Sequence, residues 1–337
     1  MFVVHHNDDD GRCAAAIVQR EFTSFETVDE HNYIEYGHSG EIAHDFIEEL
    51  RPMGDSVYIV DLALDDVIIQ LIRDILAQKP NTKIIHIDHH ETTFKRMENL
   101  SDEDKVIMSN ENITKFYRKD ACGALLTYIY SCMTEDERAH IDEMYYDFTE
   151  EGSHFAFFLD TPQQRIYRIP MMLRYINDWD TWTHAFKETK YFNLGFGCVG
   201  DKHPMNPVWD ILYGNDITII DKYLKDGMAI YSYKESENRH KMKFAHEYNI
   251  SWVTRDGEFK QTTMLCLNSN GNSTVFGDKI NEYDVVCLYM YHGDTQKWYY
   301  SIYSTRGIDV SEIAEYYGGG GHPGASGFQI DDLIFLR

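Results

Sequence analysis

The stretch Ile84-Ile85-His86-Ile87-Asp88-His89-His90 joins a short apolar run to a polar end. Apolar runs rich in β-branched residues are typical of strands that are buried on both faces of a parallel sheet. Two other runs have the same form: Phe2-Val3-Val4 precedes His5-His6, and Val57-Tyr58-Ile59-Val60 precedes Asp61. The sequence therefore predicts three buried strands, each ending in polar side chains.

Helical stretches alternate with these runs. Residues 11–22 are rich in alanine, and residues 65–78 carry apolar side chains at helical spacing. Such alternation predicts a mainly parallel sheet with crossover helices. We also predict a fourth strand at Lys105–Met108 and a long helical region from Gly123 to near Ile176, with the N-terminus of the helix at Cys122-Gly123 facing the strand ends as an anion contact.

The chain has 337 residues, which fits two domains better than one. Composition shifts to Gly, His and Pro near residue 200, and residues 216–248 form a charged, helical pattern. Beyond them, residues 285–291 and 298–304 predict strands, and residues 310–317 a helix. We predict an α/β fold with a metal-binding domain at 1–190, a helical linker at 191–248 and a smaller α/β domain at 249–337.

Charge limits the partners that this chain can bind. With 31 basic and 56 acidic side chains the formal charge is −25, so strong binding to long duplex nucleic acid is not expected. No apolar run is long enough for a membrane span, and the first residues lack the basic segment of a signal peptide. Six scattered cysteines without a C-x-x-C pair are typical of a reduced protein. We expect a cytoplasmic protein without membrane contacts, and a homodimer is compatible with the sequence.

The polar residues at the three strand ends should meet at one edge of the sheet. Taken singly, Asp8-Asp9-Asp10 suits an acidic turn, Asp61 a helix cap, and His89-His90 a surface pair. Their repeated placement favours a metal site, because clustered carboxylates repel one another without cations. Two divalent ions would remove the repulsion and suit in-line attack on a phosphate ester. Mixed oxygen and imidazole ligands favour Mn²⁺, with Mg²⁺, Co²⁺ or Zn²⁺ as weaker candidates.

A glycine-rich stretch, Gly318-Gly319-Gly320-Gly321-His322, is the second unusual feature. Successive glycines allow positive φ, and their N–H groups can cradle an anion. A flexible hairpin is the alternative for such a stretch. Arg306 precedes the stretch, and arginine can bind phosphate with two hydrogen bonds. The stretch resembles the G-G-G-H signature of a known domain family, and this resemblance implies that Arg306, Gly319, Gly320, Gly321 and His322 bind substrate.

Together, the pattern H-x-D-x-D-G at residues 6–11, Asp61, the D-H-H at residues 88–90 and the later G-G-G-H resemble the DHH phosphoesterases with their associated C-terminal GGGH domain. The resemblance implies that Asp88 orients a neighbouring ligand and that His90 lies near the substrate phosphate as catalytic residues. It implies one metal held by His6, Asp8 and Asp61, and a second held by Asp10, Asp61, His89 and Asp178. Asp180 is a rival to Asp178.

The long middle segment resembles the oligoribonuclease (nanoRNase) members of this family. That resemblance implies an exonuclease that cuts short oligonucleotides to mononucleotides in a cleft between the two domains. A cyclic dinucleotide and a 3′,5′-bisphosphate nucleotide stay open as substrates. An inorganic pyrophosphatase is disfavoured by the GGGH stretch, and a non-catalytic nucleotide-binding protein is disfavoured because no expected ligand is missing.

Overall fold

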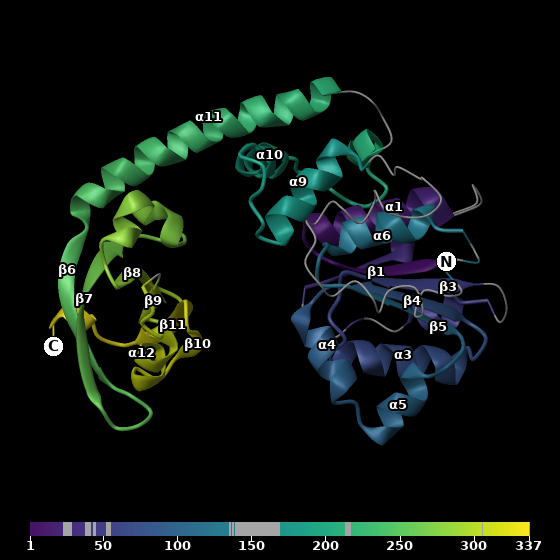
Figure 1. The fold of residues 1–337 in the computed structure, drawn as a ribbon, viewed down its shortest axis with the longest axis horizontal. Coiled ribbons are helices and arrows are strands. Elements are labelled where there is room, and N and C mark those ends of the chain that lie inside the picture. Colours follow the sequence, from purple (N-terminus) through teal and green to yellow (C-terminus); the bar gives the residue numbers. More distant parts are fainter. Residues whose placement is uncertain are drawn as a thin grey trace. The chain divides into compact units, whose positions relative to one another are not determined.

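The computed structural model describes residues 1–22, 29–37, 42, 45–51, 55–134, 136, 138, 169–212, 217–304 and 306–336. The chain forms two compact units, Met1–Met228 and Ala229–Arg337, which we call unit 1 and unit 2. Each unit has its own sheet and its own apolar core (Figure 1). The mixed α/β class expected from the sequence is confirmed. No helix in the described ranges combines the length and the apolar character that crossing a membrane would need.

Unit 1 is built on a parallel sheet, as predicted. In the described part of the chain the sheet has five strands in the order β2-β1-β3-β4-β5, and every neighbouring pair is parallel. The strands are β1 (Phe2–His6), β2 (Tyr33–Tyr36), β3 (Ser56–Val60), β4 (Lys83–Asp88) and β5 (Ile113–Tyr117). The three predicted strands are β1, β3 and β4, which lie side by side at the centre of the sheet. Their polar ends therefore meet at one edge.

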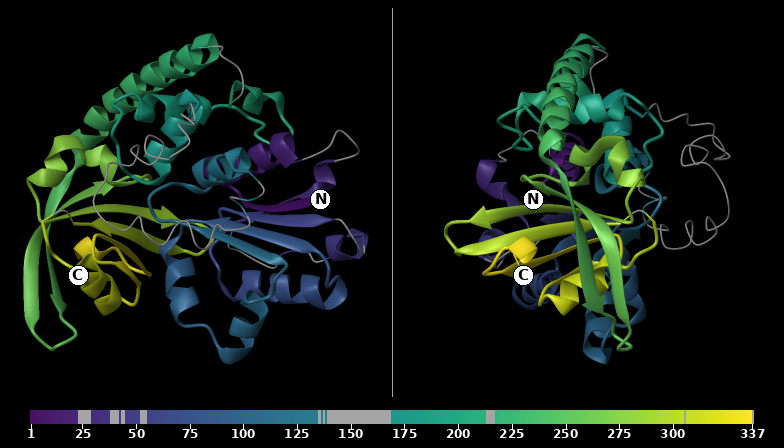
Figure 2. Two further views of the ribbon diagram at one scale, coloured as in Figure 1. Left: turned by 45° about the vertical axis from the view of Figure 1, so that its right-hand side comes forward. Right: turned by 90° about the vertical axis from the view of Figure 1, so that its left-hand side faces the viewer.

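Helices cover both faces of this sheet (Figures 1 and 2). One face packs against α1 (Asp9–Phe22), α6 (Gly123–Cys132) and α9 (Met171–Asp180). The other packs against α2 (Phe46–Glu49), α3 (Asp66–Gln78), α4 (Glu91–Glu98) and α5 (Asp102–Met108). Two apolar layers thus bury both sides of the central strands, which is why those strands are continuously apolar.

The predicted strand at Lys105–Met108 is wrong, because these residues belong to helix α5. Ser101 caps this helix, with its side chain accepting a hydrogen bond from Asp104 N at 3.1 Å. Acidic residues fill the first turn, where they complement the helix dipole. The edge strands β2 and β5 were not predicted. Of the long helical region expected from Gly123 to near Ile176, the structure gives α6 and α9, and most of residues 135–168 lie outside the described residues.

Residues beyond the predicted domain end at 190 also pack in unit 1. Helix α10 (Thr189–Phe196), the 3-10 helix η3 (Pro207–Leu212) and the first half of α11 (Ile217–Lys241) contribute Phe192, Trp209 and Tyr223 to its core. The division between the units falls inside α11, between residues 228 and 229. The range 191–248 that we expected as a linker is thus divided between the two units at residue 228.

Helices α10 and α11 approach each other through two glycines. A Cβ atom added at Gly195 would lie 1.9 Å from Tyr223 O, and one added at Gly227 would lie 1.7 Å from Tyr191 O. Both distances are far below van der Waals contact. The backbones can meet this closely only because neither position carries a side chain.

We expect Gly195→Ala to lower the free energy of unfolding of unit 1 by about 2–3 kcal/mol, because the added methyl group forces two packed helices apart. Urea unfolding followed by circular dichroism measures this change. Gly200→Ala is the matched control: an added Cβ there meets nothing within 4 Å, so a change within about 0.5 kcal/mol is expected. Equal stabilities of the two variants would contradict the proposed helix contact.

Unit 2 is a sheet with one helix packed on each side of its described strands. The strand order is β10-β11-β9-β8-β7-β6, with β7 and β8 parallel and the other pairs antiparallel. The strands are β6 (His246–Val253), β7 (Phe259–Asn268), β8 (Val285–His292), β9 (Lys297–Tyr303), β10 (Gly320–His322) and β11 (Ala325–Ile330). Helix α12 (Val310–Tyr316) and the 3-10 helix η5 (Ser273–Asn281) pack in separate apolar clusters.

Candidate metal centre

The polar residues that follow β1, β3 and β4 come together at the edge of the parallel sheet. Three groups have ligand atoms that all lie within 4.8 Å of one another. These groups are His6, Asp8 and Asp61; Asp61, His89 and His90; and Asp10, His89 and Asp180. The groups share Asp61 and His89, so they form one continuous cluster, which we call the acidic cluster. Five of the six predicted metal ligands belong to it.

Asp61 lies at the centre of the acidic cluster. It has a positive φ of 57° directly after β3, a strained conformation for a residue with a side chain. Its Oδ1 lies 3.1 Å from His89 Nε2, and its Oδ2 lies 3.9 Å from His6 Nδ1. The side chain is almost completely buried, and Oδ2 accepts no hydrogen bond from any described residue. A buried carboxylate oxygen without a donor is costly unless a cation or a proton sits beside it.

His6 and Asp8 are held by the turn between β1 and α1. His6 Nδ1 lies 2.7 Å from Asp8 Oδ2, and Asp8 Oδ1 accepts a hydrogen bond from Gly11 N at 2.9 Å. A Cβ atom on Gly11 would lie 2.5 Å from His6 O. The glycine of the H-x-D-x-D-G pattern is therefore required for α1 to begin this close to the end of β1.

Asp10 links the acidic cluster to the start of α6. Its two carboxylate oxygens accept hydrogen bonds from Gly123 N at 2.7 Å and Ala124 N at 2.9 Å. Asn177 Oδ1 accepts a third, from Cys122 N at 2.9 Å. The N-terminus of this helix does face the acidic cluster, as predicted. Its N–H groups are taken by these side chains, however, so the expected contact with a substrate anion is replaced by a contact with Asp10.

Gly123 lets α6 begin directly against Asp61. A Cβ atom on Gly123 would lie 2.6 Å from Asp61 Cβ and 2.8 Å from Asp61 Oδ1. We expect Gly123→Ala to displace the Asp61 carboxylate and to weaken Mn²⁺ binding by about 10–100-fold, the range for disturbing a ligand's support. Calorimetric titration with Mn²⁺ measures the affinity. Gly293→Ala, at an open turn in unit 2, serves as the control, and equal affinities of both variants would contradict this packing.

The pKa values of His89 and His90 shift in opposite directions. Burial lowers the pKa of His89, so this imidazole is neutral at pH 7, the form that binds a metal. For His90 burial also lowers the pKa, but the hydrogen bond from its Nδ1 to Asp88 Oδ1, at 2.7 Å, outweighs it and raises the pKa. Asp88 also accepts a hydrogen bond from the Thr93 hydroxyl. Asp88 thus orients His90.

Asp178 and Asp180, the two candidates for the fourth ligand, lie in different surroundings. Asp178 lies outside the acidic cluster, and its carboxylate is used within the chain. Its oxygens accept hydrogen bonds from Thr183 Oγ1 (2.7 Å), Ala185 N (2.6 Å), Phe186 N (3.3 Å) and Thr189 Oγ1. Although burial raises the pKa of Asp178, these hydrogen bonds hold it below its usual value. Asp178 therefore fixes the segment that follows α9.

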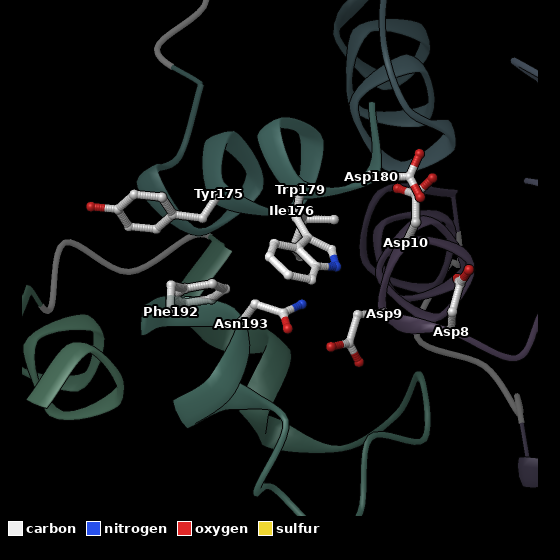
Figure 3. Close-up of a pocket in the computed structure, with 9 residues that line it drawn as sticks. All are labelled: Asp8, Asp9, Asp10, Tyr175, Ile176, Trp179, Asp180, Phe192 and Asn193. Atoms are coloured by element: carbon white, nitrogen blue, oxygen red, sulfur yellow. The ribbon is translucent and has the colours of Figure 1, made fainter. Parts of the chain in front are cut away.

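Asp180, the rival residue, takes the place expected for Asp178. Its Oδ2 lies 3.3 Å from His89 Nε2 and, like Asp61 Oδ2, is buried without a hydrogen bond from the described residues. Residues two apart on a helix point about 200° apart around its axis, so Asp178 and Asp180 cannot face the same site. In Figure 3 the Asp180 carboxylate lies beside that of Asp10.

Electrostatics favour a cation at this position. Burial, followed by repulsion from Asp10 and Asp8, raises the pKa of Asp180 to about 8. The same two causes raise the pKa of Asp61 well above its ordinary value. The donors are carboxylates and imidazoles, which suit Mn²⁺ and similar divalent ions. The residues present therefore fit divalent metal ions.

A cavity of about 320 Å³ opens beside the acidic cluster (Figure 3). It is lined by Asp8, Asp9, Asp10, Tyr175, Ile176, Trp179, Asp180, Phe192 and Asn193. Asp9 does not join the metal-binding groups, because Lys202 Nζ lies 2.6 and 2.9 Å from its two oxygens. Sequence reasoning missed Lys202, Asn177 and Thr93. Lys202 and Asn177 are far in sequence from Asp9 and Cys122, their partners, and Thr93 belongs to no recognised motif. These three contacts therefore could be identified only from the fold.

The predicted substrate-binding residues of unit 2 are on its surface. Gly320, Gly321 and His322 form the edge strand β10, so much of the glycine stretch is regular structure rather than a loose hairpin. Gly319 and Gly321 would bring an added Cβ within 2.1 Å of Gly327 O and 2.6 Å of Ser326, respectively. The exposed Arg306 lies with Nη1 3.4 Å from Glu282 O and Nε 3.7 Å from Asp284 Oδ1.

The chain is similar to a viral protein and, more distantly, to solved structures that include two bacterial proteins. An uncharacterized protein of Acanthamoeba polyphaga mimivirus, R106, is 28% identical over 182 residues, which cover 52% of this chain but only 39% of the viral protein. An uncharacterized protein from Helicobacter pylori G27 aligns over 99% of this chain and 94% of its own, with 15% identity and a TM-score of 0.36. A pGpG-specific phosphodiesterase from Vibrio cholerae, PggH, aligns over 98% and 93%, with 13% identity and a TM-score of 0.38.

A family model identifies the C-terminal part of the chain. Residues 273–336 match the DHHA1 domain, and this range includes Arg306 and the whole glycine stretch. The D-H-H motif at residues 88–90 and the acidic cluster around it lie in unit 1. The match therefore shows a DHHA1 domain at the C-terminus, and the D-H-H motif and the acidic cluster of unit 1 resemble the DHH phosphoesterases.

Proposed function

We propose that unit 1 binds two divalent metal ions and that the protein is a phosphodiesterase for short oligonucleotides. His6, Asp8 and Asp61 would hold one ion, and Asp10, Asp61, His89 and Asp180 the other, most readily Mn²⁺. One observation carries the proposal. Asp61 Oδ2 and Asp180 Oδ2 are both buried within the acidic cluster, and neither accepts a hydrogen bond from the described residues. Divalent ions held there supply Lewis-acid activation of a phosphate ester and of water.

The side chains around the ions have separable roles. Asp61 belongs to two of the three ligand groups, so it suits a bridging position. His90, held by Asp88 and favoured in its charged form, can donate a hydrogen bond to a phosphoryl oxygen as charge develops there. Asp88 is a positioning residue for His90. Asp10 keeps its two hydrogen bonds to α6 and would bind an ion with its remaining lone pairs.

In unit 2 we propose that Arg306, Gly319, Gly320, Gly321 and His322 bind a substrate phosphate. The DHHA1 match includes all five residues. Arg306 is half exposed and partly neutralised by Asp284, so its guanidinium remains accessible to a second anion. Gly319, Gly320, Gly321 and His322 are exposed residues as well. The N–H of Gly319 donates a hydrogen bond to Ala314 O at 2.8 Å, so this glycine would contribute close approach of the backbone rather than a donor.

Short substrates fit the charge of the protein. A chain with a net charge of −25 lacks the basic surface that long nucleic acids need. A short oligonucleotide presents few phosphates, so a few local contacts are sufficient. A cyclic dinucleotide and a 3′,5′-bisphosphate nucleotide present similar phosphates and are the alternative substrates. A non-catalytic nucleotide-binding protein is the alternative from another functional class.

The test is hydrolysis by the full-length protein with Mn²⁺ bound. We would incubate it with 5′-labelled RNA of two to five nucleotides, with a 24-mer, with a cyclic dinucleotide and with a 3′,5′-bisphosphate nucleotide. Release of mononucleotides from the short RNA alone is expected. Preferential hydrolysis of another substrate would move the assignment to that class. Bound Mn²⁺ measured by elemental analysis, with no hydrolysis of any of the four, would contradict an enzymatic function for these substrates.

A further inference from the structure

The lining of the cavity beside the acidic cluster is acidic at one end and aromatic at the other. At one end are the carboxylates of Asp8, Asp10 and Asp180, and at the other are the rings of Tyr175, Trp179 and Phe192 (Figure 3). A site that holds only metal ions and a phosphate has no use for an aromatic wall. The ligand of this cavity should therefore have an anionic end and a flat, apolar end.

Trp179 connects the two ends. It directly precedes Asp180 on α9, so the residue that joins the acidic cluster and the residue that lines the cavity are neighbours in sequence. Its ring contacts that of Trp182, with 6.1 Å between the ring centroids and 25° between the ring planes. It also contacts the ring of His184, with 5.9 Å between the centroids. In Figure 3 the indole lies between Tyr175 and the carboxylates.

The segment that holds Trp179 is strained. Trp182 and His184 both have positive φ, 54° and 49°, although neither is glycine. The hydrogen bonds that Asp178 accepts from Thr183 and Ala185 maintain this shape. Strained backbone that is held by buried hydrogen bonds is typical of functional sites. Asp178 therefore has a reason to be present even though it is not in the acidic cluster.

Asn193 supplies a polar group at the same wall. It lines the cavity from α10, and its side-chain amide forms no hydrogen bond with other described residues. An amide carries both donors and an acceptor, which suits the edge of a nucleobase. Lys202 neutralises Asp9 on the same side, so this part of the cavity does not repel a nucleotide by that charge.

We infer that this cavity is the nucleobase subsite of the enzyme: the base stacks on Trp179, its polar edge meets Asn193, and its phosphate lies at the acidic cluster. The inference rests on the proposed function, since that function places a phosphate at the cluster. A volume of about 320 Å³ is at the lower end for ligand pockets. The cavity therefore accommodates one nucleoside and not a stack of bases.

The kinetic test compares a substrate with bases and one without. For the Mn²⁺-loaded protein we would measure kcat/KM for an RNA dinucleotide and for bis(p-nitrophenyl) phosphate, and take their ratio. Trp179→Ala should lower this ratio by about tenfold, the loss expected for one base–aromatic stack, mainly through KM. Trp179→Phe should retain most of it. Tyr233→Ala, which removes an exposed ring from α11, is the control and should retain the wild-type ratio.

A binding measurement keeps the inference testable if the variants lose activity. Saturation-transfer NMR of the metal-free, full-length protein with adenosine should show transfer to the base protons, and Trp179→Ala and Asn193→Ala should each reduce it. Ribose should give no transfer. An unchanged ratio in Trp179→Ala together with unchanged transfer to adenosine would overturn the nucleobase subsite while leaving the phosphodiesterase proposal intact. Absence of hydrolysis by wild-type protein, with transfer to adenosine retained, would overturn only the phosphodiesterase proposal.

Discussion

Asp180→Asn is expected to reduce Mn²⁺-dependent hydrolysis of an RNA dinucleotide by at least about 100-fold, because loss of even an outer partner of a metal ligand costs 10–100-fold. The Asp180 carboxylate lies 3.3 Å from His89 and is buried without a hydrogen bond from the described residues. Replacing it with a neutral amide removes a charge that an ion would use. The fold should be retained, because Asp180 forms no hydrogen bond that supports the chain in the described region.

Asp178→Asn should lower the stability of the fold and leave Mn²⁺ binding unchanged. An amide nitrogen would face donors such as Thr189 Oγ1 and Phe186 N, so buried N–H and O–H groups would lose their acceptor. Each buried donor left unsatisfied costs about 1–3 kcal/mol. We expect a loss of about 3 kcal/mol in the free energy of unfolding, with Mn²⁺ still bound by the folded fraction.

Urea unfolding and Mn²⁺ titration of the two variants test this pair. The assignment of Asp180 as a metal ligand predicts that one variant loses metal and the other loses stability. If Asp178→Asn instead lost Mn²⁺ binding at wild-type stability and Asp180→Asn kept it, the ligand would be Asp178, as first predicted from the sequence. The two positions are so close in sequence that each serves as the control for the other.

Asp61→Asn is expected to abolish activity and yet to stabilise the metal-free protein. A metal ligand is worth several kcal/mol of transition-state stabilisation, so kcat/KM should fall by about 10³-fold or more. Without metal, burial and the neighbouring carboxylates raise the pKa of Asp61 well above its ordinary value. The charged form is therefore unfavourable in the folded protein, and a neutral amide of the same shape removes that cost.

The pH dependence of this effect has a definite sign. Asp61 and Asp180 have raised pKa values in the folded state, about 8 for Asp180 against an ordinary value of 3.8 for an aspartate. Between pH 3.8 and about 8, Asp180 holds more protons in the folded protein than in the unfolded one. The free energy of unfolding therefore falls as the pH rises through this window. Asp61→Asn should gain more over the wild type at pH 8 than at pH 5.

Thermal unfolding with and without Mn²⁺ measures both parts of this prediction. The wild type should gain in Tm when Mn²⁺ is added at pH 8, because an ion that binds only the folded state stabilises it. Asp61→Asn should start from a higher Tm without metal and gain little on addition of Mn²⁺. A lower Tm for metal-free Asp61→Asn at pH 8 would mean that Asp61 supports the fold, which contradicts a position reserved for a cation.

The sequence alone predicted the central part of the fold because buried strands have short, continuous apolar runs. The strands β1, β3 and β4 are covered on both faces, so their apolar runs are continuous and easily recognised. Strands β2 and β5 lie at the edges of the sheet and mix polar with apolar residues, so they carry a weaker signal. Lys105–Met108 was predicted wrongly because a run of three apolar residues does not distinguish strand from helix, whereas the Ser101 cap does.

The acidic cluster was largely predictable for a related reason. In a parallel sheet, residues that directly follow adjacent strands must meet, so His6, Asp61 and His89 could be placed together without coordinates. No such rule applies to α9, which reaches the site by packing across α1 and α6. The sequence places Asp178 and Asp180 on that helix equally well, and only the rotation of the helix decides which one faces the cluster.

What the sequence by itself determined is the parallel core, the meeting of polar side chains at the strand ends and the glycine stretch of the DHHA1 domain. Only the tertiary structure decided that Asp180 rather than Asp178 lies in the acidic cluster, that Asp10 meets the start of α6, and that Trp179 and Asn193 share a cavity with the acidic cluster. The physical reason is the separation in sequence between the residues that interact. Strand ends follow from periodicity over a few residues, whereas helix rotation, buried hydrogen bonds and cavities follow from contacts between segments far apart in the chain.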